Sequence, residues 1–479
     1  MNYRMIKHTL AWLMMFEAGF MLVPLITAAI YRERAIISFA LTMFICAATS
    51  ILLLLVYKPK STALYAREGF VIVALSWIFL SAFGAIPFVL SGSIPSYIDA
   101  LFETVSGFTT TGASILAEVE TLPRSILMWR SFTHWIGGMG VLVFIMAFLP
   151  LSGAKNMHIM RAESPGPSVS KLVPRVRTTA LILYTIYIVL TLTQFVLLLL
   201  GGMSVFEAIN TSFATAGTGG FGFKNDSMAS FSPYIQVTIT VFMLLFSLNF
   251  SSYYLAFKGR LKDAFNAEVR TFILIVIVAI VAVTLNIYGT FKSLGETVRH
   301  AAFTVASIIS TTGFTTADFD LWPEFSKGIF LLLMWIGACA GSTGGGIKVS
   351  RILILFKGTR RQIKMLLHPR QVKKITMDSR PVDHELVSSV NSYMIFYLIV
   401  FFSSVLIISL ENYDFMTSFS AVSATINNIG PGLSLVGPTC NFSFFSIPSK
   451  LVLIFNMLAG RLELFPMLLL FTPSTWKNK

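Results

Sequence analysis

Four stretches of the sequence share a composition that could bind a bare cation. They read IDALFETVSGFTTTGAS (98–114), VFEAINTSFATAGTGGFG (205–222), VRHAAFTVASIISTTGFT (298–315) and FMTSFSAVSATINNIGPG (415–432). Each is a helix-like run that ends at a glycine after a short polar stretch, and the aligned glycines are Gly112, Gly219, Gly313 and Gly430. Glycine permits a backbone in which successive carbonyl oxygens face one way. A ring of such carbonyl groups can replace the water shell of a monovalent cation.

The residues that precede these glycines carry no charge. The candidate cation-binding residues are Thr110, Thr111 and Gly112; Gly217, Thr218 and Gly219; Thr311, Thr312 and Gly313; and Asn428, Ile429 and Gly430. A calcium or magnesium pore would be expected to carry a ring of acidic side chains here. One Thr-Gly pair would indicate only a turn, but four of them at intervals of 107, 94 and 117 residues are a specific signal. The pattern therefore predicts a site for a dehydrated monovalent cation.

Three acidic residues lie near these stretches and have two possible roles. Glu103 and Glu207 precede the first two glycines by about two helical turns, and Asp318 follows the third. Their charges either raise the cation concentration at the mouth of a pore or lie on a solvated rim. The sequence leaves both alternatives open.

The elements that must position these stretches are membrane-spanning helices. The chain is 55% hydrophobic and only 12% charged, and a helix needs about 20 apolar residues to cross a bilayer. Ten candidate spans lie at about 10–30, 36–56, 70–90, 128–150, 180–200, 234–257, 271–289, 328–357, 392–410 and 450–471. With the N-terminus inside, most of the 36 Lys and Arg fall on the inner side. This positive-inside bias predicts cytoplasmic termini and explains the net charge of +14 without nucleic acid.

The four stretches divide the chain into repeats of span, half-span and span. We expect an accessory helix pair at 1–57, pore repeats at 66–153, 175–260, 268–358 and 389–479, and a basic cytoplasmic loop at 359–388. An even number of crossings separates the half-spans, so all four enter from one side and surround an axis normal to the membrane. Non-helical backbone at membrane depth must be buried in protein or line a wet cavity. The predicted fold is an all-α membrane protein with pseudo-fourfold repeats around one pore.

A second glycine-rich segment, GSTGGGIK (341–348), interrupts the span at 328–357. It differs from a phosphate-binding P-loop because Ile347 separates the Gly from the Lys and no strand precedes it. Glycine and serine are poor helix formers, so the helix should unwind there. We expect a movable plug across the ion path that comprises Gly341, Ser342, Thr343, Gly344, Gly345, Gly346 and Lys348. The alternative is a kink that allows close helix packing.

Arg461 lies about halfway along the last span, where an unpaired charge is costly. It must face water or a partner, and a structural alternative pairs it with Glu463 or with loop carbonyl groups. Because residues two apart on a helix do not share a face, a direct pair with Glu463 within one helix is disfavoured.

These motifs together resemble the Trk/Ktr/HKT superfamily of potassium transporters, most closely its bacterial Trk-type membrane subunits. The matching motifs are SGFTTTGAS, HWIGGMGV (134–141), ISTTGFTTADFD, GSTGGGIKVSR, NNIGPGL and LAGRLELFP (458–466). The resemblance implies potassium selectivity through four filter glycines, a gating loop at 338–348 and an arginine, Arg461, beneath the filter. It also implies a homodimer and a cytosolic ring of nucleotide-binding regulatory subunits of the TrkA type.

The sequence therefore predicts potassium uptake through a gated pore in the bacterial inner membrane, with potassium as the transported ion and nucleotide bound only by a partner. The competing hypothesis is a symporter that couples potassium to protons or sodium. The deep charges that the sequence indicates, Arg461, Glu463 and Glu17, offer little for such coupling. An enzyme is not expected, because the sequence contains no HExxH or GxSxG motif.

Overall fold

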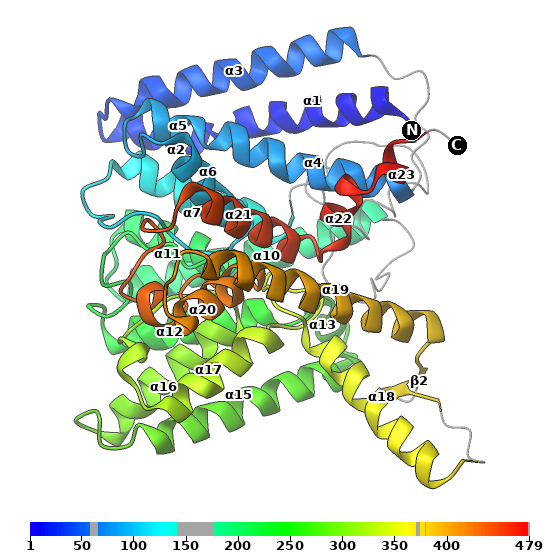
Figure 1. Ribbon diagram of the computed structural model, residues 1–479. Coiled ribbons are helices and arrows are strands. Elements are labelled where there is room, and N and C mark those ends of the chain that lie inside the picture. The colour runs from blue at the N-terminus through cyan, green and yellow to red at the C-terminus, as the bar shows by residue number, and fades with distance from the viewer. Residues whose placement is uncertain (58–65, 141–175, 370–373, 379, 478–479) are drawn as a thin grey trace.

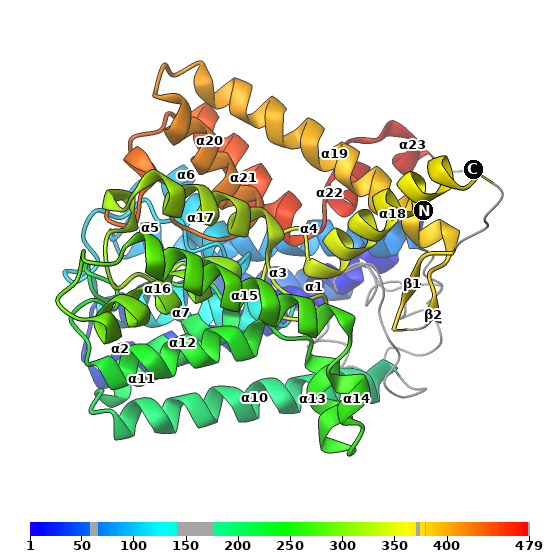
Figure 2. The ribbon, with the colours of Figure 1, turned by 90° about the horizontal axis from the view of Figure 1, so that it is seen from below.

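The protein is a bundle of roughly parallel helices. The structure, a computed structural model, describes residues 1–57, 66–140, 176–369, 374–378 and 380–477. Figure 1 shows that both chain ends lie at one end of the bundle, beside α23 (Pro473–Trp476), and that α18 (Val349–Leu367) projects from the same end farther down. Seen from below, the same end also carries α13 (Phe250–Phe257), α14 (Leu261–Ala264) and the hairpin of β1 (Thr376–Met377) and β2 (Arg380–Pro381) (Figure 2).

The accessory helices at the N-terminus pack on one side of the bundle. They are α1 (Tyr3–Phe20), α2 (Leu22–Ile30) and α3 (Ala35–Val56). Helix α1 packs against α3 and also against α4, the first helix of the first repeat. Much of α3 is exposed and apolar, as expected for a surface that faces lipid.

The remaining helices form four repeats of the predicted kind. The first helices of the repeats are α4 (Ala66–Gly84, extended by α5, Ile86–Leu90), α10 (Val176–Leu200), α15 (Ala267–Asn286) and α19 (His384–Ser409). The half-span helices are α6 (Tyr97–Phe108), α11 (Val205–Gly217), α16 (Leu294–Ile309) and α20 (Phe415–Ile426). The second helices are α7 (Arg124–Gly138), α12 (Pro233–Ser247), α17 (Glu324–Ile336) and α21 (Ile447–Arg461).

The repeats pack in cyclic order. Each half-span helix packs against the second helix of the preceding repeat: α11 against α7, α16 against α12 and α20 against α17. Helix α6 of the first repeat packs against α21 of the fourth, which closes the ring. This arrangement is the pseudo-fourfold architecture that the sequence predicts.

All four half-span helices begin at a side chain that caps the first turn. The caps are Ser96, Ser204, Ser293 and Asp414, and each side-chain oxygen accepts a hydrogen bond from the backbone N–H three residues later. Such N-caps satisfy amide groups that a helix leaves unpaired. Although partial burial acts in the opposite direction, hydrogen bonds from Thr417 hold the pKa of the Asp414 carboxyl below its usual value. These caps fix where each half-span helix enters the bundle.

The second helices differ from the continuous spans expected for them. The span predicted over 234–257 is bent by 90° between α12 and α13, and the last span is broken between α21 and α22 (Phe465–Phe471). Helix α7 ends at Gly138, and most of the remainder of the span predicted at 128–150 lies outside the described residues. By length and composition, six described helices could cross a membrane, or seven if the bent pair is one span. The breaks are tolerated because protein buries the freed backbone.

Candidate functional site

Each half-span helix ends in the same backbone turn. One or two positions after the end of each helix, a residue other than glycine has a positive φ. The values are +56° at Thr110, +56° at Thr218, +60° at Thr311 and +54° at Asn428. This left-handed conformation is uncommon for such residues. Two positions later, a glycine again has a positive φ. These glycines are Gly112, Gly220, Gly313 and Gly430. We call the four triplets 110–112, 218–220, 311–313 and 428–430 the filter segments.

The second filter segment lies one residue later than predicted. We expected Gly219 to align with Gly112, but Gly220 has the positive φ, +74°. The backbone N–H of Gly219 donates to Ala214 at 2.9 Å, a bond to the residue five positions earlier. The middle residues of the other segments, Thr111, Thr312 and Ile429, make the equivalent bond. Gly217 is the last residue of α11, so the segment is Thr218, Gly219 and Gly220. The pattern Thr-x-Gly, which the first and third segments share, would have placed the second segment correctly.

The four filter segments touch one another in a closed ring. A methyl group added at Gly112 would overlap the carbonyl oxygen of Gly219, and one at Gly220 would overlap that of Thr312. An added methyl at Gly313 would in turn overlap the carbonyl oxygen of Ile429. At Gly430 it would approach the carbonyl oxygen of Thr111 to 2.8 Å, which completes the circle.

Each filter glycine therefore faces the middle carbonyl group of the next segment, and no side chain fits between them. Four uncharged backbone segments with adjacent carbonyl groups are the donor set that a dehydrated monovalent cation requires. The half-span helices also end at this ring, so the negative ends of their dipoles favour a positive charge there.

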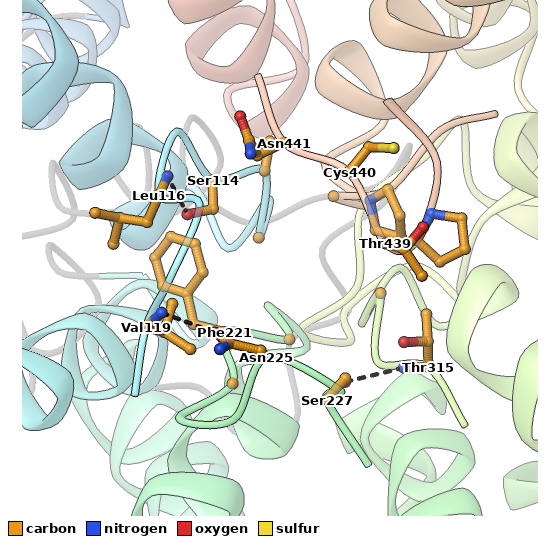
Figure 3. Close-up of a pocket in the computed structure, with 18 of the residues that line it drawn as sticks. Ser114, Leu116, Val119, Phe221, Asn225, Ser227, Thr315, Thr439, Cys440 and Asn441 are labelled. Carbon is orange, nitrogen blue, oxygen red and sulfur yellow. Dashed lines mark hydrogen bonds between the residues drawn. The ribbon is translucent and has the colours of Figure 1, made fainter. Parts of the chain in front are cut away.

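A cavity of about 140 Å³ opens on one side of the ring. Its walls come from all four repeats and include Ser114, Asn225, Thr315 and Asn441, which surround the opening in Figure 3. All four filter glycines line it, and none of its lining residues is acidic. The cavity therefore gives access to the ring of filter segments, and no carboxylate side chain lines the way to it.

Of the three acidic residues near the ring, Glu103 has neither of the roles considered for it, whereas Glu207 and Asp318 are partly exposed and both alternatives stay open for them. Glu103 is fully buried, and its carboxylate pairs with Arg130 at 2.7 Å, so it is neither a mouth charge nor a solvated one. Glu207 accepts from the backbone of Ser204 as part of the cap of α11. Asp318 accepts from the backbone N–H of Asp320 in a short turn. The three acidic residues have similar positions relative to the glycines in the sequence, but each makes a different local interaction in the structure.

The Glu103–Arg130 pair ties the first filter segment to the second. Glu103 accepts hydrogen bonds from Ser114 and from the backbone N–H of Ile115, just after the first segment. Arg130 donates to the carbonyl group of Gly222 at 3.0 Å, and its guanidinium lies 4.1 Å from the centre of the Phe221 ring. Loss of one partner from a buried pair of this kind costs about 3–5 kcal/mol.

His134 connects the same two segments from α7. Its Nδ1 donates to the carbonyl group of Gly107 at 2.7 Å, and its Nε2 accepts from the backbone N–H of Phe221 at 3.2 Å. The imidazole is fully buried and lies close behind Gly219. The residue thus supports the ring by hydrogen bonding between elements.

The segment 337–348 between α17 and α18 is non-helical and docks directly on the ring. We call it the 337–348 loop. The backbone N–H of Gly345 donates to the Thr311 hydroxyl at 2.7 Å, and that of Gly346 donates to the carbonyl group of Asn427 at 3.1 Å. An added methyl at Gly344 would approach the carbonyl oxygen of Ser310 to 2.9 Å. The loop therefore covers the third and fourth filter segments on the side opposite the cavity.

Charged side chains hold the 337–348 loop at both ends. The carboxylate of Glu268, at the start of α15, accepts from the backbone N–H groups of Ala340 at 2.7 Å and Ser350 at 3.2 Å. Arg351, at the start of α18, pairs with Glu463 at 2.5 Å. Within the loop, the buried ammonium group of Lys348 donates to the carbonyl group of Gly344.

Arg461, the last residue of α21, covers the first filter segment on the same side as the 337–348 loop. Its guanidinium donates to the Thr110 hydroxyl at 3.3 Å and to the Thr343 carbonyl at 2.8 Å. It also donates to the carbonyl groups of Gly137 and Gly138, at 2.6 Å each, at the end of α7. These oxygens and the helix dipole stabilise the buried charge. A loop carbonyl is thus one of its partners, as the structural alternative allowed.

The sequence reasoning missed the residues that hold these segments in place. The second glycine is placed one position early, at Gly219 instead of Gly220, and neither Arg130 nor Glu268 is identified from the sequence. The list of deep charges, Arg461, Glu463 and Glu17, was therefore incomplete. Arg130 and Glu268 sit inside or at the start of apolar helices, and a charge in that position is the signal that could have found them.

Comparisons with known proteins show which proteins the chain resembles in sequence and in overall fold. A family model described as TrkH, cation transport protein, matches residues 35–478. The Trk system potassium uptake protein TrkH of Escherichia coli (strain K12) is 39% identical over 485 residues that cover 100% of both chains. TrkG of the same organism is 32% identical and covers 100% of this chain and 99% of its own. The crystal structure of the potassium transporter TrkH from Vibrio parahaemolyticus matches with a TM-score of 0.90 at 35% identity, covering 100% of both chains.

The closed ring predicts a difference between two neighbouring glycines. Gly220→Ala should lower the free energy of unfolding by at least about 1–2 kcal/mol, the cost of a left-handed residue with a side chain, because the new methyl also overlaps the Thr312 carbonyl. Gly222→Ala is the control, since its methyl would meet nothing closer than 3.3 Å. Thermal unfolding in detergent measures both. Equal stability of the two variants would contradict the assigned register.

Proposed function

The chain belongs to the TrkH family of cation transport proteins, and on this premise we propose that it conducts potassium through a selective, gated pore. The observation that carries the proposal is the ring in which each filter glycine faces the middle carbonyl group of the next segment. Potassium sheds its water more readily than smaller cations, and backbone carbonyl groups can replace that water. No acidic residue lines the cavity, although Arg130 and Lys224 do, and the absence of carboxylates supports a monovalent rather than a divalent cation as the cargo.

We assign the gate to the 337–348 loop together with Arg461. The loop is bonded to the third and fourth filter segments and Arg461 to the first, so together they obstruct the path beyond the ring. The positive charge of Arg461 opposes the passage of a cation along the same path. The glycines of the loop allow it to rearrange without the clashes that side chains would impose.

The assembly that we propose is a homodimer in the bacterial inner membrane, with both termini cytoplasmic. A cytosolic nucleotide-binding ring of the TrkA type would dock on the basic segment that begins at α18. Figure 2 shows α18 and the β1–β2 hairpin near the two termini, with α13 and α14 toward the same end of the molecule. This arrangement supports one regulatory face.

The direct test of this function is the reversal potential of the purified protein in proteoliposomes. A pore follows the potassium Nernst potential at every pH, and rubidium uptake should persist in the presence of excess sodium or lithium. A reversal potential that shifts with the proton or sodium gradient would instead establish the symporter that is the alternative. No rubidium uptake would contradict both.

Selectivity should depend on the first filter glycine. Gly112→Ser should lower the preference for potassium over sodium at least about tenfold, which corresponds to about 1.4 kcal/mol, because the added side chain displaces the Gly219 carbonyl. Gly295→Ser is the matched control, since a side chain there meets nothing within 4 Å. Competition of sodium against rubidium uptake measures the preference. Unchanged selectivity in Gly112→Ser would count against the filter assignment.

Removal of Gly344 to Gly346 should raise basal flux. The deletion removes the N–H groups that bond to Thr311 and to the Asn427 carbonyl, so the loop can no longer rest on the ring. Rubidium uptake without any regulatory partner measures the effect, and the melting temperature shows whether the variant is folded. A folded variant with wild-type flux would show that the loop is not the gate.

A further inference from the structure

Glu17 is an acidic side chain that is buried among the accessory helices without a bonding partner. It lies near the middle of the 28-residue segment Tyr3–Ile30, which is long and apolar enough to cross a membrane. The side chain is fully buried, and neither carboxyl oxygen has a hydrogen-bond partner within the described part of the chain. The pore and the gate that we propose make no use of this residue.

The carboxyl group of Glu17 lies where α1, α3, α4 and α6 meet. A methyl group added at Gly84, the last residue of α4, would lie 3.2 Å from Oε1 of Glu17. The same methyl would lie 2.9 Å from the Phe108 ring and 3.0 Å from the Thr104 methyl group, both on α6. From α3, the free thiol of Cys46 packs in an apolar cluster with α1. Because Gly84 has no side chain, the carboxyl group can approach the end of α6, just before the first filter segment.

An ionised carboxylate is costly in this position, because a lone charge in an apolar interior must be paired, hydrated or neutralised. The helices around Glu17 carry several other titratable or charged groups. Within the described residues these are Tyr3, Arg4, Lys7 and His8 on α1, Cys46 on α3, Arg67 and Glu68 on α4, and Tyr97, Asp99 and Glu103 on α6.

These groups are bonded elsewhere or lie at the far ends of their helices. His8 is about 14 Å from Glu17 along the helix axis, because nine residues separate the two. The two charged groups of α4 lie in its first turn, whereas Glu17 meets its last residue. The two acidic groups of α6 are paired with basic side chains of α21 and α7. Arg461 lies 5.8 Å from the centre of the Trp77 ring on α4, but its guanidinium is bonded to the first filter segment and to carbonyl groups.

A proton is the ligand that fits this position. A metal cation needs several oxygen ligands at once, whereas the atoms that Glu17 meets beside Gly84 are carbons of Phe108 and Thr104. No group of three or more His, Cys, Asp or Glu side chains that could hold a metal ion occurs among the residues that the structure describes. A proton neutralises the carboxyl group without any further ligand.

We propose that Glu17 is a buried proton-binding site and that its proton keeps α1 and α4 in contact with the end of α6. Loss of the proton leaves a bare carboxylate near the Phe108 ring, two residues before Thr110 of the first filter segment. This charge can reach water only if the helices separate there. Ion flux should therefore be highest while the proton is bound.

The effect on flux rests on the proposed function, whereas the proton site does not. Glu17 is not among the residues that line the cavity at the ring. The proton is therefore bound in the accessory helices and not carried along the path of the ion. The reversal potential should stay at the potassium Nernst potential while the size of the flux changes with pH.

Infrared spectroscopy of the full-length protein in lipid tests the proton site directly. At about pH 8 exposed carboxyl groups are ionised, so the C=O stretching band of a neutral carboxyl group reports a buried one. The band should be present in the wild type and in Glu385→Gln, which removes an exposed carboxylate in the first turn of α19. It should be missing in Glu17→Gln. A wild-type spectrum without the band, or a band of full intensity in Glu17→Gln, would overturn the site.

Thermal unfolding in detergent from about pH 5 to about pH 8 tests the role of the proton in packing. The native state keeps the proton and the unfolded state releases it, so the ratio of folded to unfolded wild-type protein should fall with rising pH, by at most about tenfold per pH unit. Glu17→Gln and Glu17→Met have no proton to release, and either variant alone suffices if the other does not fold. Their melting temperatures should gain on that of the wild type as the pH rises. A difference that is constant with pH would overturn the proposal.

Rubidium uptake into proteoliposomes tests the link to the pore, over the pH range in which the infrared band disappears. Wild-type uptake should fall about fivefold as the carboxyl group ionises, which is a modest coupling between two sites, whereas Glu17→Gln and Glu17→Met should keep their uptake. Equal pH profiles in all three proteins would overturn the link to the pore. No wild-type uptake at any pH would overturn the proposed function and the effect on flux, while the infrared band still decides the proton site.

Discussion

The structure depends on four backbone segments that are pressed together inside a membrane-spanning bundle. Each filter glycine touches the middle carbonyl group of the next segment, so the ring has no room for a side chain. Carbonyl oxygens held this closely repel one another, so hydrogen bonds from the surrounding protein must hold the segments in place. The capped half-span helices, the Glu103–Arg130 pair and His134 supply that support. We propose that a ring held in this way takes a cation that has lost its water.

The same constraint explains why the 337–348 loop and Arg461, to which we assign the gate, bond directly to the ring. Helix α12 bends by 90° into α13, and α17 and α21 end near the ring, which leaves backbone groups that only protein or water can satisfy. The 337–348 loop and Arg461 satisfy several of them at once, through Thr311, Thr110 and the Asn427 carbonyl. Glu268 and the Arg351–Glu463 pair hold the ends of this assembly. Glu268 is therefore linked to the third filter segment through the 337–348 loop, by the bond from Ala340 to Glu268 and the bond from Gly345 to Thr311.

The sequence predicted the features that recur with a period and missed those that depend on a tertiary partner. Span, half-span and span repeat four times, so the architecture and three of the four filter segments followed from hydropathy and from Thr and Gly positions. The second segment was misplaced because AGTGG contains three glycines and local sequence does not say which has a positive φ. Glu103 was misread because its partner, Arg130, lies 27 residues away on another helix. The sequence around Ser247 contains no proline or glycine that would predict the 90° bend after this residue.

The most direct measurement is an experimental structure of the protein with thallium or rubidium, located by anomalous scattering. The account predicts a peak on the axis between the carbonyl groups of Thr111, Gly219, Thr312 and Ile429. It also predicts that the peak is weaker or absent in Gly112→Ser. An ion bound away from this axis, or a ring that stays empty at ion concentrations that saturate uptake, would contradict the claim that these four segments form the conducting filter.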